Sequence, residues 1–202
     1  LAALEDDADD KGVETVRTFN DLYEDMLATV ARLHALGAWP GCRIGLCAPS
    51  HYAFMVWDLA CIALGCVSVA LPNEKPAADA DLGALIERHR LTLLGIEPAW
   101  RPAGTAGLER LVDMDADFAA PIPRQRPQPI VANDRAGTHS LVFSSGTTGK
   151  TKGLVISAAG TEHLLALYHD AFGVVHGERF LTFLPFANYQ QRMIYYFCLW
   201  HG

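Results

Sequence analysis

Residues 144–153 read Ser-Ser-Gly-Thr-Thr-Gly-Lys-Thr-Lys-Gly, a stretch of glycines, hydroxyl side chains and two lysines. It lies between the largely apolar runs 140–143 and 154–156, which have the composition of buried strands. Glycines let successive backbone N–H groups converge on one point, hydroxyls add donors, and lysine supplies a positive charge that suits phosphate. We therefore expect a loop between two strands that binds a phosphorylated ligand, most simply a nucleoside triphosphate.

Two other interpretations fit parts of this stretch. A flexible Gly/Ser/Thr hairpin turn is one, but linkers rarely place two lysines between β-branched strands. The other is the P-loop, G-x-x-x-x-G-K-S/T, whose end matches Gly149, Lys150 and Thr151. Its opening glycine would fall on Ser144, and a P-loop runs directly into a helix. Here a strand pattern follows and a helical pattern begins only near Ala158, so the sequence disfavours a P-loop.

The stretch resembles the phosphate-binding signature of the adenylate-forming (AMP-binding) superfamily, S/T-S/T-G-S/T-T-G-x-P-K-G. This superfamily contains acyl-CoA synthetases, fatty acyl-AMP ligases, luciferases and the adenylation domains of peptide synthetases. The match holds at every position except Thr151, where proline is usual. Threonine leaves the loop less stiff than proline would, but it removes no phosphate donor.

The resemblance implies that the loop cradles the β- and γ-phosphates of ATP, with Mg²⁺ sharing their charge. Lys152 is the motif lysine that would neutralise the phosphates, whereas Lys150 occupies a variable position. The residues that the resemblance assigns to ATP are Ser144, Ser145, Gly146, Thr147, Thr148, Gly149 and Lys152, of which Lys152 and Thr147 are expected to act in catalysis.

Strand and helix patterns alternate along the chain before this loop. A capping box at Thr18 and Asp21 starts the first helix, which Gly37 and Pro40 end, and Ser50 is the expected cap of the second. This alternation is typical of parallel βαβ units, so we expect an α/β fold with a doubly wound, mostly parallel sheet flanked by helices. The expected later helices are 51–64 and 77–90, and the expected strands are 43–47, 66–71, 91–96 and 108–114.

Two of these segments also resemble the superfamily. Residues 39–44 resemble its V-x-P-G-D-R-V segment, with Cys42 at the position where aspartate is common. Residues 65–72 resemble its G-A-V-x-V-P-L strand. We therefore expect residues 1–17 to form an acidic lead-in and residues 18–202 to form the N-terminal portion of an AMP-binding domain.

A second constellation follows a helix capped by Ser157 and an expected strand over 178–184. Residues 184–192 read Leu-Pro-Phe-Ala-Asn-Tyr-Gln-Gln-Arg and resemble the motif L-P-L-A-H-I-F-E-R of long-chain acyl-CoA synthetases. In those enzymes the residue at the histidine position and its aromatic neighbour line the carboxylate pocket, which implies that Asn188 and Tyr189 border an acyl substrate. Asparagine can donate an amide N–H to a carboxylate but carries no charge. The alternative is that the aromatic residues of this region are only core.

Composition excludes several other classes. A net charge of −7 and the absence of a basic block argue against a nucleic-acid partner. The five cysteines include no C-x-x-C pair and have apolar neighbours, so we expect free thiols and a cytoplasmic location. No uncharged run is long enough to span a bilayer, and no secretory signal is visible. The histidines lack metal-ligand spacing and there is no G-x-S-x-G elbow, so we assign no metal ligands and no serine hydrolase activity.

The function implied is ATP-dependent activation of a carboxylic acid, such as a fatty acid, to an acyl-adenylate. Transfer to the thiol of CoA or of a phosphopantetheine-bearing carrier protein would follow. Both ends of the chain look cut, and the family's adenine-binding segment and C-terminal lysine would lie beyond Gly202, so we expect the isolated chain to be inactive. One alternative is a non-catalytic nucleotide-binding or regulatory module with the same fold; a P-loop NTPase ranks last.

Overall fold

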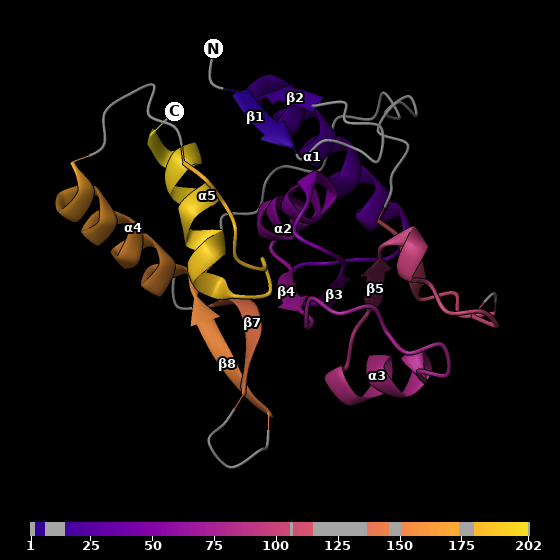
Figure 1. The fold of residues 1–202 in the computed structure, drawn as a ribbon. Helices are drawn as coiled ribbons and strands as arrows, with labels where there is room; N and C mark the ends of the chain where they lie inside the picture. The colour runs from indigo at the N-terminus through magenta and orange to yellow at the C-terminus, as the bar shows by residue number, and fades with distance from the viewer. Residues whose placement is uncertain are drawn as a thin grey trace.

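The computed structural model describes residues 3–6, 15–105, 107–114, 137–145, 151–173 and 180–201. Its centre is a six-stranded sheet in the order β6-β5-β3-β4-β7-β8 (Figure 1). Neighbouring strands run parallel except for β8, which pairs antiparallel with β7. The strands are β3 (Arg43–Cys47), β4 (Val67–Ala70), β5 (Leu93–Ile96), β6 (Leu111–Asp113), β7 (Thr138–Ser145) and β8 (Thr151–Ser157).

Helices cover both faces of this sheet, which confirms the doubly wound α/β fold. One apolar core lies on the face of α1, α2 and α5, and a second lies on the face of α3 (Figure 1). Val69 of β4 belongs to the second core, so its neighbours along the strand face the first. The helices are α1 (Phe19–Ala35), α2 (Tyr52–Leu64), α3 (Leu82–His89), α4 (Ala158–Phe172) and α5 (Tyr189–His201), with a 3₁₀ turn, η1 (Pro98–Trp100).

Local capping chemistry decides where the helices begin. The predicted capping box is confirmed at α1, where the Thr18 hydroxyl accepts from Asp21 N–H and the Asp21 carboxylate accepts from Thr18 N–H. The cap predicted at Ser50 is wrong. His51 caps α2 instead, since its Nδ1 accepts from Ala53 N–H, and Ser50 Oγ accepts from Phe186 N–H far along the chain.

Two other sequence predictions require correction. The helix expected over 77–90 begins only at Leu82, because the Asp81 carboxylate accepts from Ala84 N–H and thereby caps it. Residues 180–184 of the strand expected over 178–184 form no strand. The backbone N–H groups of Phe183 and Leu184 both donate to the Gln191 side chain, so neither is free for a neighbouring strand.

The N-terminal strands β1 (Ala3–Asp6) and β2 (Thr15–Thr18) pair antiparallel in a small sheet of their own. They fall within or next to the stretch expected as an acidic lead-in; a domain boundary after residue 17 stays a prediction. Among the described residues, none of the helices has the length and apolar character needed to cross a membrane.

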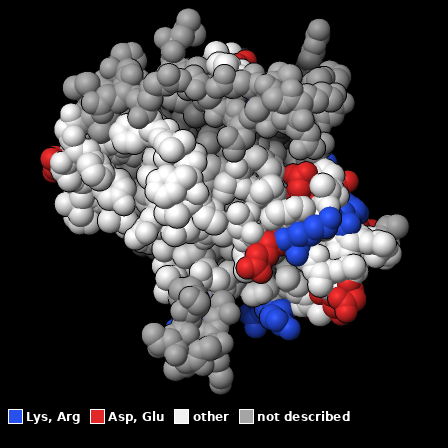
Figure 2. All heavy atoms as spheres, in the orientation of Figure 1, with Lys and Arg blue, Asp and Glu red and all other residues white. Residues whose placement is uncertain are grey.

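Charge is unevenly distributed on the surface in Figure 2. Charged side chains gather on the side where Figure 1 places α3, whereas the described atoms over α4 and α5 are mainly uncharged. Large apolar side chains in the second half of the chain are well exposed, and they include Val155 (67%), Phe172 (63%), Leu181 (79%), Phe183 (74%) and Trp200 (64%).

Candidate active site

The phosphate-loop sequence connects two paired strands. Ser144 lies opposite Lys152 and Ser145 lies opposite Thr151 in the β7–β8 ladder, and the next helix begins only at Ala158. A strand therefore follows the loop, which rules out the P-loop arrangement. Residues 146–150, with the predicted ligands Gly146, Thr147, Thr148 and Gly149 and with Lys150, lie outside the described residues, as do the side chains of Ser144 and Ser145.

Lys152 has an exposed side chain at the start of β8. Four residues further on, Ile156 packs against the core on the face of α2 and α5. Side chains alternate along a strand, so Lys152 projects from this same face of the sheet. The motif lysine and helix α5 thus share one side of the sheet, and Lys152 is free to meet a ligand there.

Asn188 and Tyr189 form the start of α5. The Asn188 Oδ1 atom accepts from Gln190 N–H at 3.2 Å, which is the contact of a helix N-cap. The Asn188 side chain is exposed, and its amide NH₂ remains available as a donor. Tyr189 is half-buried, with its hydroxyl bonded to that of Thr161 in α4. The pair lies at the solvent boundary of the α4–α5 layer, where a substrate could contact both.

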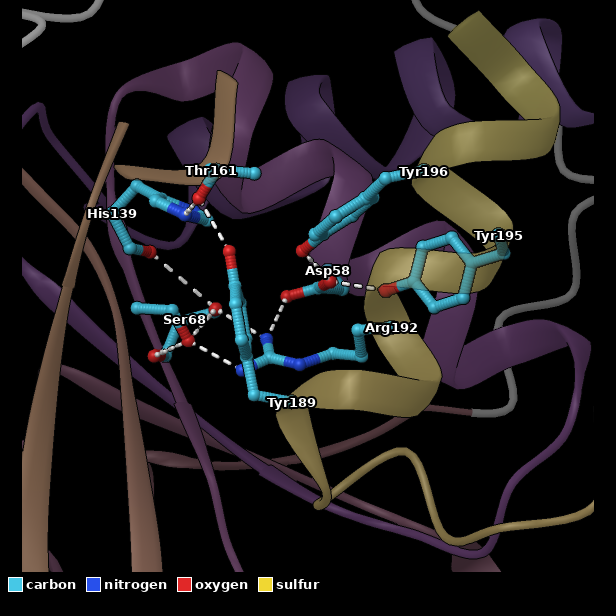
Figure 3. A network of polar contacts seen from close by, with 9 residues as sticks. Asp58, Ser68, His139, Thr161, Tyr189, Arg192, Tyr195 and Tyr196 are labelled. Carbon is cyan, nitrogen blue, oxygen red and sulfur yellow. Dashed lines mark hydrogen bonds and ion pairs between the residues drawn. The ribbon is translucent and has the colours of Figure 1, made fainter. Parts of the chain in front are cut away.

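One turn further along α5, Arg192 lies at the centre of a buried polar network (Figure 3). Its Nη1 donates to Asp58 Oδ1 at 2.8 Å and to Ser68 Oγ at 3.1 Å, and its Nη2 donates to Ser140 Oγ at 2.6 Å. The hydroxyls of Tyr195 and Tyr196 both donate to Asp58 Oδ2. Asp58 and Arg192 are fully buried, and charges so buried are rare unless they are paired, as they are here.

Each charge in the network stabilises the other. Burial alone raises the pKa of the Asp58 carboxyl, but the Arg192 guanidinium and the tyrosine hydroxyls outweigh it and hold that pKa below its ordinary value. For Tyr195 and Tyr196, burial and the Asp58 carboxylate both raise the pKa, which keeps their hydroxyls protonated as donors. The network is therefore a fixed carboxylate–guanidinium pair, and none of these groups is poised for proton transfer near neutral pH.

A second chain of contacts joins this network to Tyr189. His139 Nε2 lies 2.6 Å from Thr161 Oγ1, which also contacts the Tyr189 hydroxyl (Figure 3). His139 occupies a register shift in the β7–β8 ladder between Thr138 and Ser140. Such a bulge re-aims side chains, which explains why adjacent residues His139 and Ser140 both contact partners in the α4–α5 layer. Burial lowers the pKa of His139, while Asp58 raises it and Arg192 lowers it further.

Sequence reasoning named Asn188, Tyr189 and the Arg192 position but missed Asp58, Ser68 and His139. One signal was available: Asp58 is the single charged residue of α2, in the otherwise apolar run Tyr-Ala-Phe-Met-Val-Trp-Asp-Leu-Ala-Cys-Ile-Ala-Leu. A lone acid in such a helix requires a buried cation, and Arg192 lies in a similarly apolar and aromatic helix. No spacing rule could join residues 134 positions apart.

The structure defines a class, the doubly wound α/β proteins, with a Gly/Ser/Thr/Lys-rich sequence between the paired strands β7 and β8, and comparison with known proteins gives the family. Residues 3–202 match the family model described as AMP-binding enzyme, so the chain belongs to the AMP-binding enzyme family. It is 29% identical over 173 residues to the nonribosomal peptide synthetase ungA' of Aspergillus campestris, which covers 84% of this chain and 2% of that protein. It is 27% identical over 205 residues to the long-chain-fatty-acid–CoA ligase FadD15 of Mycobacterium bovis, covering 91% of this chain and 34% of the ligase.

Solved structures give the same fold. The o-succinylbenzoate CoA synthetase MenE of Bacillus subtilis superposes with a TM-score of 0.78 at 18% identity, covering 93% of this chain and 38% of that one. A further MenE structure, at a TM-score of 0.76, is a complex with ATP and magnesium ion. The chain thus spans about a third of the length of the acyl-CoA ligase and of the MenE chain that it matches.

Proposed function

We propose that this chain is the N-terminal part of an enzyme that activates a carboxylic acid with ATP. The acid carboxylate attacks the α-phosphorus in line, and an acyl-adenylate and pyrophosphate form. The observation that carries this proposal is the placement of Lys152: an exposed ammonium opposite Ser144, on the face of the sheet that also carries Asn188 and Tyr189.

The residues act by positioning and charge stabilisation, since phosphoryl-type transfer leaves little covalent chemistry to the protein. Backbone and hydroxyl donors of Ser144, Ser145 and residues 146–148 would hold the phosphates that leave as pyrophosphate, with Mg²⁺ bound to the nucleotide sharing their charge. Lys152 would neutralise the same oxygens. Asn188 would donate its amide N–H to the acid carboxylate, and the Tyr189 ring would border the acyl group.

A thiol would accept the acyl group in the second half-reaction. The relatives fit this step: one is named a CoA ligase and another a nonribosomal peptide synthetase. CoA and a carrier-protein phosphopantetheine are chemically equivalent acceptors at the sulfur, so we propose the thiol class without choosing between them. For the substrate we propose a carboxylic acid, such as a fatty acid, without naming a particular one.

Because the chain matches only part of its relatives, we propose that activity requires further residues of a longer protein. The chain covers 34% of the matched ligase and 38% of the matched MenE chain, and several large apolar side chains among the described residues are well exposed, including Val155, Leu181 and Phe183. We propose that the remainder of a longer protein covers part of this exposed apolar surface. We expect the isolated chain to show no acid-dependent ATP–pyrophosphate exchange and the full-length protein to show it.

The test is exchange measured with the full-length protein over a panel of carboxylic acids, with hydroxylamine added separately to trap the acyl-adenylate. Lys152→Met should lower exchange about 10²-fold or more, the scale of losing one charge-stabilising donor. Lys150→Met, at the variable position two residues away, is the matched control and should retain most activity. ATP binding without exchange for any acid would instead support a non-catalytic nucleotide-binding module.

A further inference from the structure

Arg192 ties the first turn of α5 to three other elements. Its guanidinium contacts Asp58 in α2, Ser68 in β4 and Ser140 in β7. In Figure 3, Asp58 and Ser68 lie on different sides of the guanidinium. A planar guanidinium donates only within its own plane, so partners on three elements fix both the position and the rotation of the helix turn that bears it.

Two of these links lead to the proposed site. The Tyr189 ring lies against the guanidinium, with 5.3 Å between the Arg192 Cζ atom and the ring centroid, and Asn188 lies four residues before Arg192, hence on the same side of the helix. Ser140 belongs to β7, the strand that continues into the phosphate-loop sequence at Ser145. Arg192 therefore joins the turn of Asn188 and Tyr189, which we propose to bind the acid, to β7, the strand that leads into the proposed phosphate loop.

A contribution to stability does not by itself explain why the buried Asp58–Arg192 pair is present. Replacing a buried ion pair by apolar residues of similar volume is often neutral or stabilising, because both charges lose their hydration. What apolar packing cannot supply is directional contacts that select one rotation of α5 against β7. Within the network, the hydroxyl of Ser68 also donates to that of Ser140, and this hydrogen bond joins β4 to β7 beside the guanidinium.

We propose that Arg192 is a positioning residue for acyl-adenylate formation: it fixes Asn188 and Tyr189 relative to β7, and so sets the approach of the acid carboxylate to the α-phosphorus of ATP. This inference rests on the proposed function. It assigns Arg192 no contact with substrate. A misplacement of about 1 Å is enough to cost about 10²-fold in rate, so loosening this joint affects the acid far more than the nucleotide.

The test is Arg192→Lys in the full-length protein, which keeps the charge but removes the planar fork. We expect kcat/KM for the acid to fall about 10- to 100-fold, with the KM for ATP changed less than about twofold. Arg101→Lys is the matched control, because Arg101 forms a 2.8 Å pair with Asp113, the last residue of β6, away from α5. This control should leave both constants unchanged.

A merely structural role would show a different pattern. Partial unfolding lowers the active fraction, which reduces apparent kcat and leaves the KM for the acid unchanged; a pyrophosphate burst counts the active sites directly. Should Arg192→Lys fail to fold, Ser140→Ala removes the β7 partner of Arg192, together with the Ser140 bonds to Ser68, and keeps the Asp58 pair. It should raise the KM for the acid several-fold.

The outcomes separate the two proposals. Acid-dependent exchange in the wild-type protein, together with wild-type acid constants per active site in Arg192→Lys or Ser140→Ala, overturns the positioning role alone. Absence of acid-dependent exchange in the wild-type protein overturns the proposed function, and the positioning role falls with it. A selective loss for the acid supports both.

Discussion

Arg192 Nη1 lies 2.8 Å from Asp58 Oδ1, and neither side chain has any exposed surface. The pair joins α5 to α2 across the apolar core on one face of the sheet. Because neither charge can reach water, each depends on the other, and the consequences for stability are larger than for any surface pair.

Removing one partner should therefore be costly. Arg192→Met is expected to lower the free energy of unfolding by about 3–5 kcal/mol, because the Asp58 carboxylate is left buried and unpaired. The double variant Arg192→Met/Asp58→Asn should recover most of that loss, since the Asn carbonyl still accepts from both tyrosine hydroxyls without a charge. Urea unfolding followed through midpoint and slope measures this. Arg101→Met, which breaks a part-exposed pair, should cost about 1 kcal/mol or less; an equal loss in both single variants would contradict the argument.

His139 should make stability depend on pH. Burial lowers its pKa, so the unfolded chain binds a proton near pH 6.5 that the folded chain does not. Stability from this group is therefore complete above about pH 6.5 and declines as the pH falls, by at most about 1.4 kcal/mol per pH unit. His139→Gln should flatten the slope of unfolding free energy between about pH 6.5 and 5. His163→Gln, exposed on α4, is the control, and an unchanged slope in His139→Gln would refute the assignment.

Gly95 should not tolerate a methyl group. A Cβ at this position of β5 would lie 2.8 Å from the Trp57 ring and 2.9 Å from Met114 Cγ. Both neighbours are fully buried, so Gly95→Ala should cost about 1–3 kcal/mol by overpacking. Gly107→Ala is the control, because nothing lies within 4 Å of its added Cβ. Thermal unfolding of the two variants in parallel would show whether the sheet and α2 are packed as closely as described.

A substitution at Asn188 can add a negative charge while keeping the side-chain oxygen that caps α5. Asn188→Asp keeps an N-cap oxygen and suits the helix dipole, so the fold should lose no stability. A carboxylate beside the proposed acid site would repel the substrate, and we expect the KM for the acid to rise about tenfold, equivalent to about 1.4 kcal/mol. Gln190→Glu places the same charge two residues further on and should change the KM for the acid much less. Equal constants for both variants would remove Asn188 from the acid site.

The sequence allowed much of the fold to be predicted because the relevant signals are local. The capping box at Thr18, the glycine after α1 and the alternation of short apolar runs all act over a few residues. The loop sequence and its two flanking strands could be predicted for the same reason. Helix starts were displaced where an unexpected residue capped the helix: His51, an uncommon cap, at α2, and Asp81, a favoured cap, at α3.

What could not be predicted depends on distant contacts. The expected strand over 178–184 has a strand-like composition, but Gln191 binds two of its backbone N–H groups from the following helix. The buried network combines residues from five elements, and the bulge that turns His139 toward Thr161 arises only once β8 has paired with β7. Asp58 was missed although it is the single charged residue of an apolar helix, and nothing in the sequence indicates which cation would pair with it.

The direct pairing of Ser144 with Lys152 means that the orientation of Lys152 depends on the register of β8 against β7. If β8 slipped by a single residue, every side chain of the strand would change faces, and Ile156 would leave the core for water while Lys152 turned away from α5. The burial of Ile156 at one end of β8 therefore determines the face from which Lys152 projects at the other end. We therefore expect substitutions in residues 146–150 to leave the direction of the Lys152 side chain unchanged, because the β7–β8 register sets it.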